Sequence, residues 1–222
     1  MGRNGMVTVS AYQPRPFPCL HWLNRLTSSD VFVLLDDFQF KRQSWQQRYE
    51  IWMHDHPHRL TIPVDHDTLF NPINQVRTAP GHWREKHLKT LKQCYGGEPH
   101  FREIYERAAY IYEYNYLGDI SLSSIRLTLD YLGIDTPIIY SSRLGVEGKA
   151  TEYLVNLCRK LGADTYLSGG TAYNTYMELD RFKEAGIKVK VQDWKCAYEP
   201  YGDISIIDPL MRLGEEARRW IT

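Results

Sequence analysis

The sequence has 222 residues, of which 43% are hydrophobic and 24% are charged, a composition typical of a globular domain rather than of a disordered or fibrous chain. Lysine plus arginine and aspartate plus glutamate each total 27, so the formal net charge is zero. A chain without net positive charge has little attraction for a polyanion, which argues against a nucleic-acid partner and favours a small-molecule substrate.

Five short apolar segments rich in β-branched residues predict strands. They are Met6–Ala11, Val31–Leu35, Pro137–Tyr140, Thr165–Leu167 and Ile187–Val191. Helical periodicity follows the third strand, where Gly162 closes the helix, and again the fourth strand over Met177–Ala185, which Gly186 closes. Glycine is the usual residue just after a helix. This alternation predicts a parallel sheet joined by right-handed crossovers.

The middle of the chain departs from this alternation. Residues 44–64 contain two strand-like segments around the turn-rich residues 54–57, which predicts an inserted β-hairpin. Three helical segments follow over residues 83–132, namely Trp83–Tyr95, Phe101–Tyr116 and Leu122–Leu132. We expect one α/β domain over residues 1–222, with a Rossmann-like, mostly parallel sheet flanked by helices.

Features that would direct the chain to a membrane or out of the cell are missing from the sequence. Its longest apolar segments, such as Val31–Leu35, are far shorter than the roughly 20 residues that a membrane-spanning helix needs. The first residues have no apolar signal core. Four cysteines without a Cys-x-x-Cys pair suit reduced thiols. We expect a cytoplasmic protein without membrane insertion. A homo-oligomer is compatible with the sequence.

Polar residues gather just after the predicted strands, where the loops of a parallel sheet converge on one side and bind ligands. We expect substrate-binding residues at these positions: Tyr12, Gln13, Gln39, Lys41, Trp45, Arg48, Ser168, Gly169, Gly170, Tyr173 and Asp193. The cations Lys41 and Arg48 suit a carboxylate or phosphate. The topology predicts that Gln13, Asp36, Ser168 and Asp193 surround a single crevice.

The adjacent carboxylates Asp36 and Asp37 are the first candidates for a catalytic base, because they directly follow an apolar strand. A strand-terminal aspartate often only caps the next turn, so the structural alternative stays open. The Ser168-Gly169-Gly170 segment has exposed backbone N–H groups that suit an anion. It lacks the acidic and hydroxyl residues that follow Ser-Gly-Gly in ATP-pyrophosphatase loops.

Metal ions and cofactors are not predicted. His54, His56 and His58 alternate as metal ligands do, but they surround Pro57 in a hairpin turn without a partner cluster. No Rossmann Gly-x-Gly-x-x-Gly, P-loop or Gly-x-Ser-x-Gly motif is present in the sequence. Cys19 falls in the first loop, where a chemical role and simple packing are both open.

Five sequence blocks resemble the WbqC-like family, whose members are encoded in bacterial O-antigen and other surface-polysaccharide clusters. The blocks run almost end to end: Tyr12-Gln13-Pro14 with Pro18 and Leu20, residues 31–48, residues 60–64 with the helix of residues 83–95, residues 166–170, and residues 205–208. The residues depart from the family signature at four places, where Tyr12, Pro16, Cys19 and His21 stand for its His, Tyr, Trp and Gly. His21 is therefore a candidate substitute base or a helix-cap residue.

The resemblance implies a group-transfer enzyme, because a glycine transferase role has been suggested for relatives in O-antigen clusters. We expect aminoacyl or acyl transfer to a nucleotide-activated amino sugar or a related small metabolite, in polysaccharide or natural-product biosynthesis. A nucleotide-sugar and an acyl donor would be its substrates. Two alternatives remain: a nucleotidyltransferase-like enzyme, and a non-catalytic scaffold of a sugar-tailoring complex.

Overall fold

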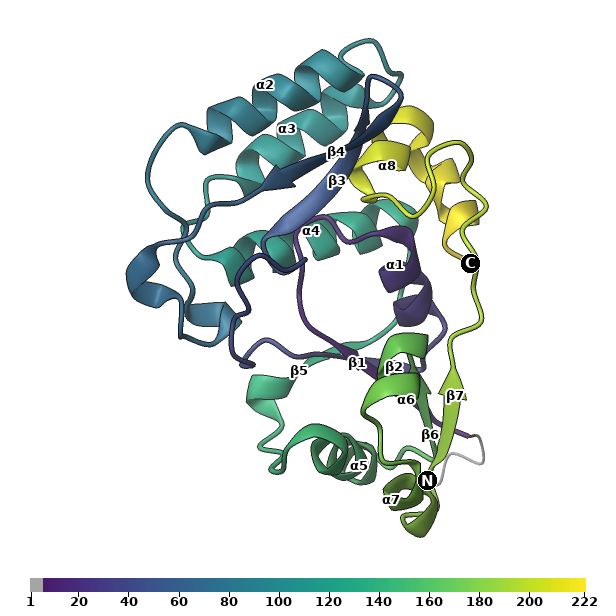
Figure 1. Ribbon diagram of the computed structural model, residues 1–222. Helices are drawn as coiled ribbons and strands as arrows, with labels where there is room; N and C mark the ends of the chain where they lie inside the picture. The colour runs from purple at the N-terminus through teal and green to yellow at the C-terminus, as the bar shows by residue number, and fades with distance from the viewer. Residues whose placement is uncertain (1–5) are drawn as a thin grey trace. The chain divides into compact units, whose positions relative to one another are not determined.

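A computed structural model describes residues 6–222, and they group into two compact units (Figure 1). Unit 1 comprises residues 6–12, 24–35 and 136–194. Unit 2 comprises residues 13–23, 36–135 and 195–222. The expectation of one domain over residues 1–222 stays a prediction.

Unit 1 is built on a parallel five-stranded sheet, which confirms the predicted α/β class. Its strands are β1 (Thr8–Tyr12), β2 (Val31–Leu34), β5 (Ile138–Tyr140), β6 (Thr165–Ser168) and β7 (Lys188–Val191). They lie in the order β5-β2-β1-β6-β7, and every neighbouring pair is parallel. The five strand predictions are therefore confirmed to within two residues at each end.

The burial of each strand follows its place in the sheet. All four residues of β6 are buried, as expected for an apolar strand with a neighbour on each side. The edge strand β7 exposes Lys188 and Lys190, and exposed lysines discourage pairing with a further strand. Successive strands are added on one side of β1, first β2 and then β5, and afterwards on its other side, first β6 and then β7. The direction in which strands are added therefore reverses between β1 and β6, although all five strands stay parallel.

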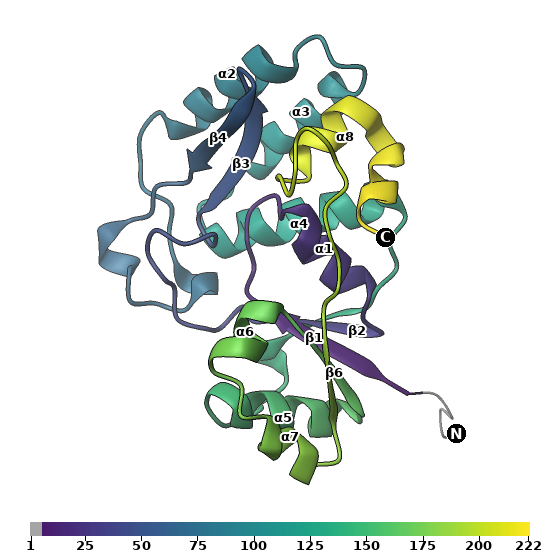
Figure 2. The ribbon, with the colours of Figure 1, turned by 45° about the vertical axis from the view of Figure 1, so that its right-hand side comes forward.

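Helices α5 (Ala150–Leu161) and α7 (Leu179–Glu184) pack against each other beside this sheet (Figures 1 and 2). Gly162 follows α5 with a φ of 65°, the left-handed conformation that the sequence predicts for a glycine C-cap. The predicted helix over Met177–Ala185 is shorter than expected. The buried Met177 lies before α7, in contact with Ser168, and the short helix α6 (Gly170–Thr175) precedes it.

Unit 2 contains the predicted hairpin, with β3 (Arg48–Met53) paired antiparallel to β4 (His56–Thr61). Its turn residues His54 and Asp55 have φ values of 49° and 62°, as a two-residue type I′ turn requires. Four helices of unit 2 are α2 (Trp83–Tyr95), α3 (Phe101–Ile111), α4 (Leu117–Leu132) and α8 (Ile207–Leu213). Helix α1 (Leu20–Thr27) has its first half in this unit and its second half in unit 1.

Two helix boundaries differ from the sequence prediction. Helix α3 ends at Ile111 rather than Tyr116, and α4 begins at Leu117 rather than Leu122. The cause is a tertiary contact: Tyr116 forms an antiparallel bridge with Arg77, and the Leu117 N–H donates to the Val76 carbonyl at 2.8 Å. Short 3₁₀ turns complete the chain: His66–Thr68, Ile73–Gln75, Ser141–Arg143 and Gly214–Trp220.

Aromatic rings form the centre of unit 2. The Phe17 and Tyr49 ring centroids lie 5.2 Å apart, and Trp83 lies 5.6 Å from Tyr112 in an edge-to-face contact, a geometry that aromatic rings favour. The hydroxyls of Tyr49 and Tyr112 form a hydrogen bond in this interior. Burial raises the pKa of both phenols, so both are neutral at physiological pH.

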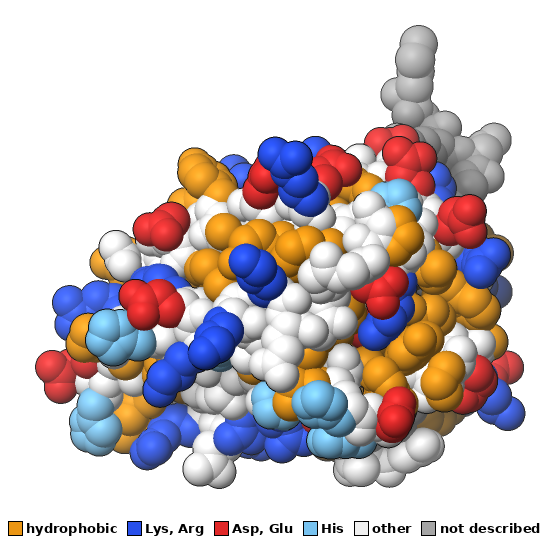
Figure 3. All heavy atoms as spheres, turned by 90° about the horizontal axis from the view of Figure 1, so that it is seen from above, with side chains coloured by type: hydrophobic (Ala, Val, Ile, Leu, Met, Phe, Trp, Pro, Cys, Tyr) orange, Lys and Arg blue, Asp and Glu red, His pale blue; other side chains and the backbone are white. Residues whose placement is uncertain are grey.

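Basic and acidic side chains are interspersed on the face shown in Figure 3, as the zero net charge leads one to expect. The four cysteines are free thiols. Within residues 6–222, no helix combines the length and the apolar character needed to cross a bilayer.

Gly118 is required by close packing, and its replacement provides a test of the fold. A Cβ atom there would lie 2.9 Å from the Cα of Asn74. We expect Gly118→Ala to destabilise the protein by about 1–2 kcal/mol, because overpacking outweighs the better helix propensity of alanine. Gly97→Ala is the control, since a Cβ there meets no atom within 4 Å. Urea denaturation checks both, and equal midpoints would contradict this packing.

Candidate active site

The candidate site begins where two distant segments of unit 2 pair with each other. Cys19 forms an antiparallel bridge with Ser205, and the Leu20 N–H donates to the Ile204 carbonyl at 3.2 Å. This pairing brings the residues just before and at the start of α1 beside residues 203–206. Chain positions more than 180 residues apart therefore contribute to one place.

Phe17 fixes the direction in which the first segment enters the site. Its φ is 40°, which is unfavourable for a non-glycine residue and persists only where the surroundings hold it. Its N–H donates to Ser124 Oγ at 2.9 Å, and its carbonyl accepts from Ser205 Oγ at 2.7 Å. Both bonds are buried, so the backbone before Cys19 is held from two sides.

Cys19, His21 and Asp203 form a cluster on these paired segments. The Cys19 Sγ lies 3.3 Å from Nδ1 of His21, and the same Nδ1 is hydrogen-bonded to Oδ2 of Asp203. The other carboxylate oxygen accepts from the His21 backbone N–H at 2.8 Å. Arg15 Nη1 donates to the Cys19 sulfur at 2.8 Å. The sulfur is thus approached by two groups that can carry positive charge.

The His21–Asp203 contact decides the charge of the imidazole. Burial lowers the pKa of His21, but the hydrogen bond to Asp203 and the contact with Cys19 outweigh burial. The net effect is a pKa raised from 6.5 to about 10. Burial opposes ionisation of Asp203, yet its bonds to His21 leave its pKa below the ordinary value of 3.8. The two side chains are therefore an imidazolium and a carboxylate at neutral pH.

A pocket of about 120 Å³ opens onto this cluster. It is lined by Arg15, Phe17, Cys19, His21, Trp45, Arg48, Tyr49, Glu50, Asp203 and Ser205. The Nε of Arg48 is buried and has no hydrogen-bond partner among the residues described, and an unpaired buried donor is unfavourable until an acceptor reaches it. Trp45 is 43% exposed, and the Arg59 guanidinium lies 5.1 Å from its ring centroid.

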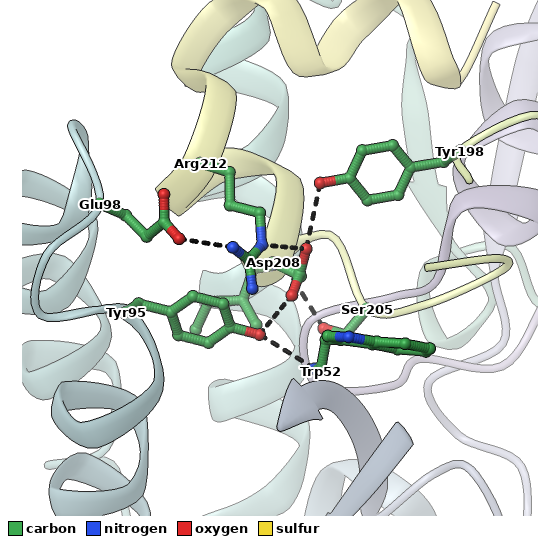
Figure 4. A network of polar contacts seen from close by, with 8 residues as sticks. Trp52, Tyr95, Glu98, Tyr198, Ser205, Asp208 and Arg212 are labelled. Atoms are coloured by element: carbon green, nitrogen blue, oxygen red, sulfur yellow. Dashed lines mark hydrogen bonds and ion pairs between the residues drawn. The ribbon is translucent and has the colours of Figure 1, made fainter. Parts of the chain in front are cut away.

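A buried polar network holds the second segment in place (Figure 4). The fully buried carboxylate of Asp208 accepts from Tyr95 at 2.5 Å, from Tyr198 at 3.1 Å and from Arg212 Nε at 3.1 Å. Its backbone N–H donates to the Ser205 carbonyl at 3.1 Å. The network therefore reaches the pocket through the residue that pairs with Cys19.

The cluster offers three possible metal ligands, since the Cys19, His21 and Asp203 donor atoms lie within 4.8 Å of one another. A metal ion bound there would have to displace the Nδ1 proton that His21 shares with Asp203. The Arg15 guanidinium also points at the sulfur and would repel a cation. The same three side chains are of the types that take part in acid–base and nucleophilic chemistry.

Unit 1 presents a second polar region where its sheet reverses direction, which is the usual ligand position in open α/β sheets. The Arg25 guanidinium lies 4.7 Å from the Tyr12 ring centroid, and Nε donates to Gln192 Oε1 at 3.0 Å. It also lies against Gly169, where a Cβ would be 2.3 Å from Nη2. Any side chain at position 169 would therefore displace Arg25.

The predicted site residues divide between the units. Unit 1 contains Tyr12, Ser168, Gly169, Gly170, Tyr173 and Asp193, and unit 2 contains Gln13, His21, Asp36, Asp37, Gln39, Lys41, Trp45 and Arg48. Of the second group, His21, Trp45 and Arg48 line the pocket.

Two other predicted residues of unit 2 are joined through Gln46. Gln13 Oε1 accepts from Gln46 Nε2 at 2.6 Å, and Gln46 Oε1 accepts from the Lys41 N–H at 2.7 Å. The expected common crevice stays a prediction.

Asp36 and Asp37 lie in the turn after β2, outside the lining of this pocket. Asp36 is buried, and its carbonyl accepts from the Asn74 N–H at 3.0 Å, whereas Asp37 is exposed. The sequence analysis did not select Asp203, because nothing in its local sequence marks it. Only the long-range pairing of the chain places it beside His21.

The chain belongs to the WbqC-like protein family, whose sequence pattern it matches over residues 13–220. It is also similar to Rv1507c, an uncharacterized protein of Mycobacterium tuberculosis, with 29% identity over 224 residues and 96% of each chain covered. No solved structure matches the chain.

The His21–Asp203 pair should make stability depend on pH in a defined direction. The pKa of His21 is raised, so its stabilisation is complete below the ordinary value of 6.5 and is lost as the pH rises through about 10. The pKa of Asp203 is lowered, so its stabilisation is present above 3.8 and is lost as the pH falls further.

Asp203→Asn should therefore lose most stability, relative to the original chain, between roughly pH 4 and pH 6.5, and the difference should shrink toward pH 10. Nuclear magnetic resonance titration of the His21 imidazole should show its pKa falling toward 6.5 in this variant. An unchanged His21 titration, or a stability difference that grows above pH 8, would contradict the pairing.

Proposed function

We propose that the protein is a group-transfer enzyme that moves an acyl or aminoacyl group onto the amine of a nucleotide-activated amino sugar or a related small metabolite. The observation that carries this proposal is the pocket that combines the His21–Asp203 pair with Arg15 and Arg48. Such a pocket supplies a proton donor and acceptor together with cationic hydrogen-bond donors. Acyl transfer needs both, since a proton leaves the amine and negative charge develops on the carbonyl oxygen.

His21 is the proposed acid–base group. Asp203 binds both its backbone N–H and its ring, which orients the imidazole as the third member of a triad orients a catalytic histidine. In this cluster the sulfur and the carboxylate approach the same ring nitrogen, so the proton on Nδ1 lies between them. Loss of the negative charge on Asp203 would release that proton more easily.

The two ends of the substrates would be recognised by different chemical groups. Arg48 and Arg15 suit the carbonyl or carboxylate of an acyl donor, and the exposed ring of Trp45 suits a sugar. Taken by itself, unit 1 has a region between β1 and β6, with Arg25 and the Ser168-Gly169-Gly170 segment, that suits the phosphates of a nucleotide. Family membership supports this general assignment.

Replacement of His21 tests the proposal. We expect His21→Gln to lower turnover about 10²–10⁴-fold, the usual contribution of a general acid–base group. His82→Gln is the matched control, because His82 also pairs with a carboxylate, Glu85 at 2.9 Å, but is 79% exposed outside the pocket. Mass spectrometry of reactions with uridine-diphosphate amino sugars and with thioester or aminoacyl donors measures the product. Equal loss in both variants would contradict the assignment.

The same assay decides between His21 and the strand-terminal carboxylates. Because Asp36 and Asp37 lie outside the pocket lining, we expect Asp36→Asn and Asp37→Asn to retain more than about a tenth of the original turnover, well above the loss expected for a missing base. If either variant lost a hundredfold or more in turnover while His21→Gln stayed active, that aspartate rather than His21 would be the catalytic base.

A further inference from the structure

Two side chains approach the sulfur of Cys19, and the residue itself lies directly before a helix. Arg15 Nη1 donates to it at 2.8 Å, and the protonated ring of His21 lies 3.3 Å away. Cys19 also occupies the N-cap of α1, since its carbonyl accepts the Leu23 N–H at 3.2 Å. Neighbouring cations and a helix N-terminus are the surroundings in which nucleophilic cysteines are found.

The other three cysteines lie in different surroundings. Burial raises the pKa of Cys158 to about 12, and burial also raises the pKa values of Cys94 and Cys196. Thiols of this kind are poor nucleophiles at neutral pH. Cys19 is also the one cysteine in the lining of the site pocket, so a small substrate bound in the pocket would contact its side chain.

We propose that Cys19 is the nucleophile of the reaction and carries the transferred acyl group as a thioester. This inference rests on the proposed function and names its covalent intermediate. The chemical class of the donor follows: a thioester or another activated ester, because a thiolate displaces such leaving groups readily. The acceptor is an amine, which attacks thioesters faster than water does.

The two steps balance without a further reactant. In the first, the Cys19 thiolate attacks the acyl carbon, the carbon–sulfur bond forms, and the bond to the leaving group breaks. The leaving group takes the electron pair and the proton of the His21 imidazolium. In the second, the amine attacks the thioester, neutral His21 accepts the amine proton, and the Cys19 thiolate leaves.

The charge of the cluster suits this sequence of proton transfers. Contact with Cys19 is one of the causes that raise the pKa of His21. Acylation removes the negative charge from the sulfur, so the imidazolium becomes a stronger acid at the moment when the leaving group needs a proton. Return of the thiolate in the second step restores the original charge. Arg48, with its unpaired buried Nε, is the donor that we assign to the carbonyl oxygen.

The test uses para-nitrophenyl acetate as a simple activated ester. Incubation of the full chain at neutral pH, followed by intact-protein and peptide mass spectrometry, should show one acetyl group on Cys19. Cys19→Ser should not be labelled in this way, whereas Cys94→Ser, a half-buried cysteine of α2, should be labelled like the original chain. Labelling of Arg15→Gln and His21→Gln should be at least about tenfold slower, the effect of weakening thiolate stabilisation.

The acetylated protein should then be isolated and mixed with glucosamine. Acetyl transfer to the sugar amine, faster than release into buffer, supports the second step. Absence of an acetyl group on Cys19, or equal labelling rates in the Arg15 and His21 variants, would overturn the inference. Stoichiometric Zn²⁺ binding that is lost in Cys19→Ser, without acylation, would overturn it in favour of a metal site. Circular dichroism and urea midpoints establish that each variant is folded.

Failure of this inference and failure of the proposed function give different results. If Cys19→Ser forms the acylated nucleotide-sugar at the original rate, group transfer stands and the thioester is wrong. If Cys19 is acetylated and discharged to glucosamine but no nucleotide-sugar accepts the group, the nucleophile stands and the proposed acceptor is wrong.

Discussion

The buried carboxylate of Asp208 is the interaction on which the rest of unit 2 depends. It is fully buried and is held by the phenols of Tyr95 and Tyr198 and by the guanidinium of Arg212. A buried charge is tolerated only where its hydrogen bonds are made, and removal of one partner leaves an uncompensated group. Helix α2, helix α8 and the loop before α8 must therefore take up one common arrangement.

That constraint reaches the candidate site through the backbone. The Asp208 N–H binds the Ser205 carbonyl, and Ser205 in turn binds Phe17 and pairs with Cys19. The hairpin joins the same arrangement, because the Trp52 N–H donates to the Tyr95 hydroxyl at 3.1 Å. The site is thus formed by a loop, the start of a helix and a hairpin, and the local sequence of each one specifies its position only weakly. One hydrogen-bond network holds all three in place.

The sequence predicted the parts of the structure that depend on local pattern. The five strands, the hairpin and helix α2 follow from β-branched segments, a turn signal and helical periodicity. Helix α8 was not predicted, since its seven residues acquire stability from contacts with α3 and β3 rather than from their own pattern. Asp203 escaped prediction for the same reason, whereas His21 was selected because it departs from the family signature that the chain resembles.

The departures from that signature depend on one another physically. The nucleophilic role proposed for Cys19 requires cations beside its sulfur, and His21 and Arg15 supply them. His21 in turn carries its charge because the Asp203 carboxylate accepts hydrogen bonds from its ring N–H and its backbone N–H. A chain with tryptophan and glycine at positions 19 and 21 could keep the same backbone pairing, since that pairing uses main-chain groups alone. The backbone pairing therefore does not dictate which side chains stand in this pocket, and the proposed nucleophile and its acid depend on the residues at positions 19 and 21.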